Sequence, residues 1–96
     1  MPKARKMDVN ELGRLVEGIA HPFRLVILDI LRKKKRLPMA ELRRLVEEAY
    51  MPIETRNLQF HVFKMQMSGL VKMEREGNRD HVELVRGVRV VVDDVD

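Results

Sequence analysis

The sequence predicts an α+β fold of four helices, a β-hairpin after them and a C-terminal strand. Apolar residues recur at helical spacing from residue 8 to residue 68, and the spacing changes to alternation after Gly69. The dipeptide Gly77-Asn78, typical of a tight hairpin turn, separates the two alternating segments. The 96 residues suit one small domain and contain no linker or repeat, so we expect residues 1–96 to form a single domain.

The first two helices are indicated by their opening residues. Asp8 with Glu11 three positions later is a capping box, and it predicts a helix over residues 8–19. Pro22 suits the first turn of a second helix, whose basic end, Arg32 to Arg36, complements the helix dipole. The broad apolar face of this second helix predicts that it is the central core helix; it comprises Phe23, Val26, Ile27, Ile30 and Leu31.

Two further helices follow a short extended segment at Pro38. The third, AELRRLVEEAY, buries Leu42, Leu45 and Val46, and the fourth covers residues 54–68 and ends at Gly69. The fourth helix is unusual because its apolar residues do not keep to one side. Leu58, Val62 and Met65 share one face, whereas Phe60, Phe63 and Met67 fall nearly opposite them, beside Arg56.

The last third of the chain predicts strands. LVKMERE and DHVELV flank the turn dipeptide, so we expect a hairpin over residues 70–85. Residues 88–96, VRVVVDDVD, are rich in β-branched side chains and predict a further strand before an acidic end.

Charge favours nucleic acid as the partner. Asp93, Asp94 and Asp96 concentrate negative charge at the C-terminal end, so the rest of the chain is more basic than its net charge of +4. The basic residues form clusters at Lys3, Arg5 and Lys6, at residues 32–36, and around Arg75 and Arg79. Basic runs also solvate ordinary surfaces, so charge alone only favours a polyanion.

Several function classes are disfavoured. Without cysteine there is no disulfide, thiolate metal site or cysteine nucleophile. No apolar run has the length of a membrane span or a signal peptide, so we expect a cytoplasmic, nucleoid-associated protein. His21, His61 and His81 lie on unlike elements without a ligand pattern, and no catalytic constellation is visible. We therefore expect no enzyme activity, no metal and no cofactor. Separately, the high content of charged residues is typical of proteins from thermophiles.

Four segments occur in an order that resembles a known family: IAHPFRLVILDIL, MAELRRLV, NLQFHVFKM and SGLVKMEREGNRDHVEL. From Ile19 to Leu84 the chain is similar to the winged helix-turn-helix domain of ArsR-like transcriptional regulators and their archaeal relatives. The resemblance implies a homodimer on double-stranded DNA, with the first helix and the C-terminal segment in the dimer interface. Metal-sensing members carry cysteines that are absent from this sequence, so their effector does not carry over.

In this family the fourth helix, 54–68, enters the major groove with its N-terminal half, and the hairpin is the wing. Arginine pairs with guanine and Asn or Gln with adenine, which makes the polar residues of this half candidates for base contacts. Phe60 is a candidate for a thymine methyl group, although packing in a core or an interface is the better interpretation. The predicted DNA-binding residues are Thr55, Arg56, Asn57, Gln59, Phe60 and Lys64 in the helix, and Lys72, Arg75, Asn78 and Arg79 in the wing, 72–82.

Three functions remain open. The first is a dimeric, site-specific DNA-binding transcriptional regulator, acting as a repressor. The second is a sequence-indifferent chromatin or architectural protein, and the third is a winged-helix module that binds another protein. The amides beside Arg56 favour the first, whereas exposure of Phe60, Phe63 and Met67 would favour the third.

Overall fold

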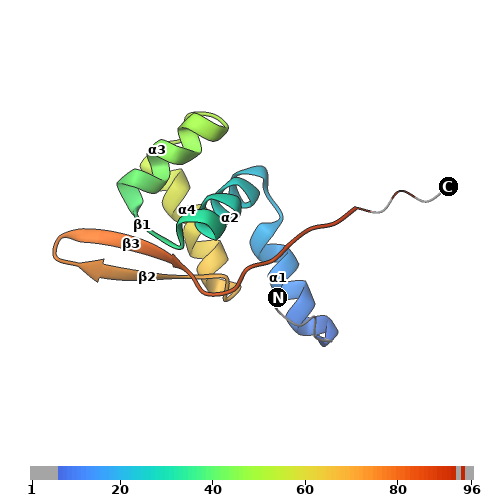
Figure 1. Cartoon of the computed structure of the whole chain (residues 1–96). Helices are drawn as coiled ribbons and strands as arrows, with labels where there is room; N and C mark the ends of the chain where they lie inside the picture. The colour runs from blue at the N-terminus through green and yellow to red at the C-terminus, as the bar shows by residue number, and fades with distance from the viewer. Residues whose placement is uncertain (1–6, 93, 95–96) are drawn as a thin grey trace.

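The computed structural model describes residues 7–92 and 94. Its elements follow the predicted order of helix, helix, short strand, helix, helix and hairpin (Figure 1). They are α1 (Val9–Ile19), α2 (Pro22–Lys34), β1 (Arg36–Pro38), α3 (Met39–Ala49), α4 (Thr55–Met67), β2 (Val71–Glu76) and β3 (Arg79–Leu84). The hairpin, β2 and β3, projects from one end of the molecule, and the C-terminal segment leaves at the other (Figure 1).

The ends of the elements have the local causes that the sequence indicates. The Asp8 carboxylate accepts a hydrogen bond from the Glu11 amide at 2.8 Å and caps α1, as predicted. Pro22 is the first residue of α2. Gly69, with φ of 79°, follows α4, and Gly77, with φ of 65°, forms the hairpin turn; both conformations favour glycine.

The core is centred on α2, as its broad apolar face predicts. Ile27 and Leu31 are fully buried between the other helices and the sheet. The remaining fully buried side chains come from α3, α4, β3 and the residue before β2: Leu42, Val46, Leu58, Val62, Met65, Leu70 and Val82. Leu45, Phe23 and Val26 are only partly buried and pack against this core. This arrangement fixes α3 and α4 relative to the wing.

The sheet has three antiparallel strands in the order β1-β3-β2. Val82 in the central strand lies opposite Leu37 on one side and Met73 on the other. The short segment before α3 thus supplies the third strand, and both edges of β3 are occupied.

The predicted C-terminal strand over residues 88–96 is wrong for the part that the structure describes. Residues 88–92 have no regular secondary structure; residues 93, 95 and 96 lie outside the described residues. After β3 the amides of Val85 and Arg86 donate to the carbonyl oxygen of Leu70, and the chain then leaves the sheet. Val88 packs on the core, and residues 88–91 pass over the side chains of α2, which offer no backbone partners for a strand.

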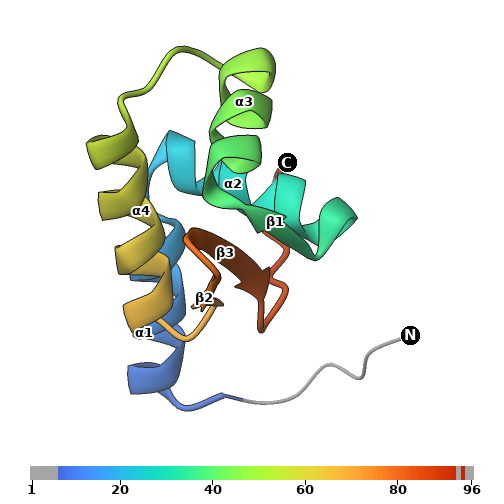
Figure 2. The same ribbon diagram turned by 90° about the vertical axis from the view of Figure 1, so that its left-hand side faces the viewer.

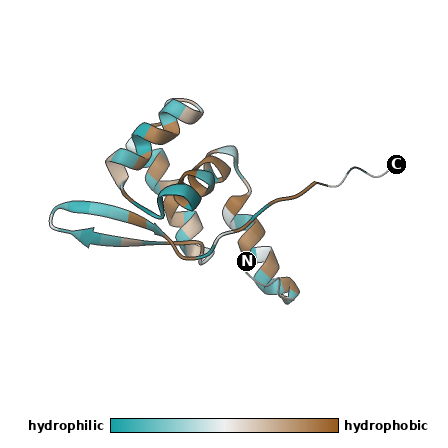
Figure 3. Cartoon of the chain, viewed as in Figure 1, coloured by the Kyte–Doolittle hydropathy of each residue, from teal (hydrophilic) through white to brown (hydrophobic). Residues whose placement is uncertain are grey.

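The two apolar sides of α4 have different surroundings. Leu58, Val62 and Met65 are fully buried, whereas Phe60, Phe63 and Met67 are 53%, 53% and 63% exposed. The visible turns of α4 carry both apolar and polar colours (Figure 3). The interpretation of Phe60 as a core residue is therefore wrong within one chain, because about half of its side chain is exposed and it is not among the core residues.

Candidate functional site

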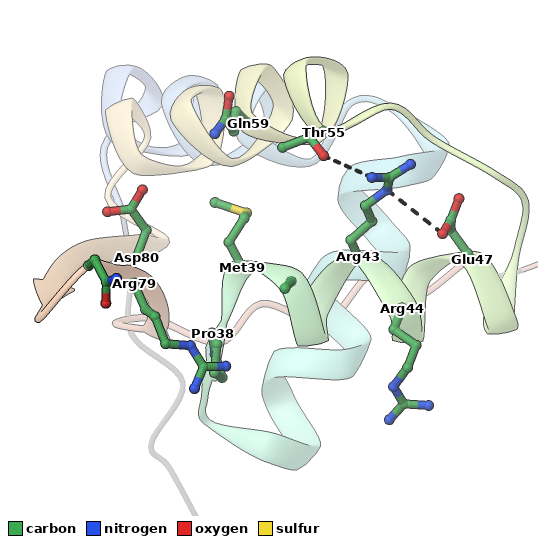
Figure 4. A pocket seen from close by; sticks show the side chains of 11 residues that line it. Pro38, Met39, Arg43, Arg44, Glu47, Thr55, Gln59, Arg79 and Asp80 are labelled. Atoms are coloured by element: carbon green, nitrogen blue, oxygen red, sulfur yellow. Dashed lines mark hydrogen bonds and ion pairs between the residues drawn. The ribbon is translucent and has the colours of Figure 1, made fainter.

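An open groove of about 470 Å³ lies between α3, the first turns of α4 and the tip of the wing (Figure 4). Thr55 and Gln59 of α4 line one wall, and Asn78 and Arg79 of the wing line another. Figure 2, which looks at the end of the molecule bearing the wing, shows α4 along one side of the hairpin and α3 above it. The other lining residues are Pro38, Met39, Ala40, Arg43, Arg44, Glu47 and Asp80.

Hydrogen bonds fix the start of α4 against α3. Arg43 donates from Nε to the carbonyl oxygen of Ile53 at 2.8 Å and from Nη1 to Oγ1 of Thr55 at 2.9 Å. The Glu47 carboxylate accepts from the Ile53 amide at 3.1 Å and lies 3.8 Å from Arg43 (Figure 4). These bonds span the connection between the two helices, so the groove wall is preorganised.

The cations of α3 at the groove are neutralised by neighbouring carboxylates. Arg44 bonds to Glu41 and to Glu48, whose Oε2 lies 2.5 Å from Nη1. The hydrogen bond from Arg44 holds the pKa of Glu41 below its usual range and raises that of Arg44. Within residues 7–92 and 94, by contrast, neither Arg56 nor Arg79 forms an ion pair, so these two cations are available to an anionic partner.

Ion pairs also occupy the charged strands of the wing. Lys72 lies 2.9 Å from Glu74 and 3.3 Å from Glu83, and these hydrogen bonds raise the pKa of Lys72 and lower that of Glu74. Arg75 lies 3.3 Å from Asp80. Two of the four predicted wing residues, Asn78 and Arg79, line the groove. The other two, Lys72 and Arg75, do not.

The predicted residues of α4 diverge from one another around the helix. Thr55 and Gln59 face the groove, and exposed Arg56 lines neither the groove nor the cavity on the opposite side of α4. Asn57 lines that second cavity instead. Lys64 is directed toward α1, where it lines a small cavity with Arg14 and Glu17.

The second cavity, about 550 Å³, contains a ring cluster that the sequence analysis missed. His21 and His61, treated there as unrelated, lie with ring centroids 4.3 Å apart, and Phe23 stacks on both. Nδ1 of His61 accepts a hydrogen bond from Nε of Arg24 at 3.2 Å, and burial, with His21 and Arg24 adding to it, lowers the pKa of His61. Phe60 and Asn57 complete the α4 side of this cavity.

Arg43 and Arg44 also line the groove, although they were not among the residues predicted from the sequence. The signal was the Arg-Arg pair in MAELRRLV, on the helix that precedes the recognition helix of the resembled family. Which side of α3 faces α4 depends on tertiary packing, so the pair alone did not identify them.

Two general findings concern the described residues as a whole. None of their helices combines the length and the apolar character needed to cross a membrane. In the same residues no three His, Asp or Glu side chains gather in a way that could hold a metal ion.

Known structures share this architecture. HlyU from Vibrio cholerae aligns with a TM-score of 0.69 at 24% identity, covering 83% of this chain and 83% of that one. The transcriptional repressor BigR from Xylella fastidiosa aligns with a TM-score of 0.68 at 22% identity, covering 80% and 72%. A homodimeric winged helix-turn-helix DNA-binding domain from Mycobacterium bovis, a possible ArsR-family regulator, gives 0.69 at 19% identity, covering 81% and 67%.

These identities are low, so the likeness is one of fold. No family model and no curated protein matches the sequence. The order of elements, the β1-β3-β2 sheet and the alignments agree with one another. The chain has the ArsR-like winged helix-turn-helix fold.

Proposed function

We propose that the chain is a dimeric, site-specific double-stranded DNA-binding transcriptional regulator that acts as a repressor. The N-terminal half of α4 enters the major groove, and the tip of the wing contacts the backbone or the minor groove. The observation that carries this proposal is the groove in which Thr55 and Gln59 of α4 lie opposite Asn78 and Arg79 of the wing. Hydrogen-bonding side chains from both elements thus face one open surface.

The charge of α4 supports a polyanionic partner. From Thr55 to Met67 the sequence has no Asp or Glu, although the whole chain contains 15 acidic residues. Arg56 and Lys64 are the cations of this helix, and Arg79 adds one at the wing tip. A surface that excludes carboxylates in an otherwise mixed-charge protein suits the phosphates that border a DNA groove.

Site-specific binding is favoured over architectural binding by the small number of unpaired cations at the groove and in the wing. Arg43 and Arg44, at the groove, are held by carboxylates, and so are Lys72 and Arg75 in the wing. A sequence-indifferent binder depends on many Lys and Arg contacts to phosphate. Here the groove presents an amide and a hydroxyl, which read base edges, beside few available charges.

A second copy of the chain is the proposed partner of α1. Val9, Leu12 and Val16 lie along one exposed side of this helix and are 84%, 51% and 52% exposed. Val90 to Val92 in the C-terminal segment are also exposed. Contiguous exposed apolar residues mark interfaces, and a two-fold dimer would bury this side of α1 against its copy. The homodimeric Mycobacterium bovis domain of the same fold supports this assembly.

The protein-binding alternative has one observation in its favour. Phe60, Phe63 and Met67 are exposed on α4, as an interaction module would require. The same helix side also carries Arg56, and the helix has no acidic residue, which a polyanion explains better than an apolar protein surface does. We therefore place DNA before protein as the partner of α4.

Selection of binding sites from random duplexes, followed by affinity measurements in a salt series, tests the proposal. A regulator should enrich a sequence with two-fold symmetry and bind it about 10³-fold or more tightly than scrambled DNA of equal length. Val16→Glu should convert the dimer to a monomer in sedimentation while leaving the helical circular dichroism unchanged. Equal affinity for both duplexes, falling steeply with salt, would support the architectural function instead. Absence of binding at low salt would leave the protein-interaction module.

A further inference from the structure

The exposed strip of α4 consists of Arg56, Phe60, Phe63 and Met67, at spacings that place them along one side of the helix. We call it the outer strip. More than half of each of its three apolar side chains is exposed, and each belongs to a helix whose opposite side is completely buried. A helix packs on the core through one apolar stripe, so aromatic rings on its exposed side do not contribute to that packing.

The outer strip is continuous with the groove. Gln59 lines the groove, and Phe63 follows it by one helical turn. Phe60 lies one turn after Arg56, and its side chain also lines the His21–His61 cavity, so the outer strip lies between the groove and that cavity. A duplex that fills the groove and contacts Gln59 would therefore extend over Phe60 and Phe63 as well.

The surroundings of the rings define the chemistry of the occupant. Lys64 places Nζ 5.6 Å from the centroid of the Phe60 ring, and Arg56 makes no ion pair in the part of the chain that the structure describes. Because the rings lie beside cations, a ligand that fits the outer strip must carry apolar groups next to negative charges. The DNA major groove does so at thymine, whose C5 methyl group projects among the base edges while phosphates border the groove.

We propose that Phe60 and Phe63 recognise thymine through contact with its C5 methyl group, so that the DNA site carries thymines at the positions facing these rings. The inference rests on the proposed function and specifies its DNA site. Cytosine carries only a hydrogen atom at C5, so it offers the rings no methyl group to contact at that position. The rings therefore discriminate thymine from cytosine by the methyl group, whereas Arg56 and Gln59 contact the polar edges of the bases.

Deoxyuridine provides the test because it differs from thymidine only by the missing methyl group. In a selected duplex, each thymine is replaced singly by deoxyuridine, and the dissociation constant is measured for the unmodified chain. At one or more positions per half-site we expect the affinity to fall about fourfold, which corresponds to the free energy of burying one methyl group. In Phe63→Ala or Phe60→Ala the affected position should lose its preference, with thymine and uracil binding within about twofold.

Met67→Ala is the matched control, because Met67 is at least as exposed as the two rings but lies one turn beyond Phe63. It should keep the thymine preference of the unmodified chain. All three variants alter exposed side chains, and thermal unfolding confirms that each remains folded.

The outcomes separate the two proposals. Specific binding that is unchanged by complete replacement of thymine with deoxyuridine would overturn the thymine inference and leave the regulator function intact. The inference is also wrong if the thymine preference persists in the double variant Phe60→Ala, Phe63→Ala. Failure to bind any duplex would overturn both the inference and the proposed function, and would assign the outer strip to a protein partner.

Discussion

The imidazole rings of His21 and His61 lie with centroids 4.3 Å apart, and Nδ1 of each ring accepts a hydrogen bond. Nδ1 of His21 accepts from the Phe23 amide at the start of α2, and Nδ1 of His61 accepts from Arg24. An imidazole that accepts through Nδ1 is neutral, with its proton on Nε2. The hydrogen bond from Arg24 that joins α2 to α4 therefore depends on the uncharged form of His61.

Acidification should weaken this contact. The pKa of His61 is lowered in the folded state, so the unfolded chain binds the proton more readily and stability rises with pH. The His61 contribution is fully present above about pH 6.5, the unperturbed histidine pKa, and is lost as the pH falls toward the folded value. We expect the midpoint of denaturant unfolding to decrease between pH 7.5 and pH 5.

His61→Asn is the matched variant for this prediction, because its amide oxygen accepts from Arg24 without titrating. Its unfolding midpoint should change less between pH 7.5 and pH 5. Glu41 and Glu74, whose pKa values are lowered, lose their contributions only below about pH 4.5, outside this window. An equal pH dependence in the variant and the unmodified chain would contradict the assignment to His61.

Arg79→Ala should weaken binding to all duplexes. It should also reduce the slope of log affinity against log salt concentration by about one. Arg79 is at the groove without an ion pair in the described residues, so its charge is available to phosphate. Lys72→Ala is the control on the same wing, because Lys72 is already held by Glu74 and Glu83. Its effect on the slope should be smaller; the reverse order would contradict the ion-pair argument.

Gln59→Ala should relax base preference at one position per half-site, with a cost of about 1–3 kcal/mol against the preferred base. The reason is that Gln59 faces the groove. Asn57→Ala, two residues away on the side of the His21–His61 cavity, should leave the preference unchanged. Binding-site selection with both variants measures the difference, and a larger effect from Asn57 would place the DNA on the other side of α4.

Gly18→Ala should destabilise the fold by about 1–3 kcal/mol through overpacking. A Cβ atom at Gly18 would lie 2.6 Å from Cβ of Ser68 and 2.8 Å from Cδ1 of Leu70, where α1 meets the end of α4. Gly13→Ala, in the same helix with open space around it, should instead stabilise by up to about 1 kcal/mol. Chemical denaturation of the two variants gives the comparison, and equal effects would show that helix propensity dominates.

The order of the elements could be predicted from the sequence because local chemistry determines it. Asp8 caps α1, Pro22 opens α2, Gly69 ends α4 and Gly77 forms the hairpin turn, each through the conformation of a few adjacent residues. The two-sided apolar pattern of α4 could likewise be predicted from helical spacing, and it led to the outer strip. The recognition of Thr55, Gln59 and Arg79 as site candidates came from their place in this order.

Tertiary structure decided which residues meet. Residues 88–96 have strand-forming side chains, yet β1 and β2 already occupy both edges of β3, and residues 88–92 do not join the sheet. Asn57 and Gln59 look equivalent in the sequence, but the packing of α4 turns Gln59 to the groove and Asn57 to His21 and His61. Local periodicity fixes which side of a helix is buried, whereas the neighbours of its exposed side depend on contacts between residues far apart in the chain.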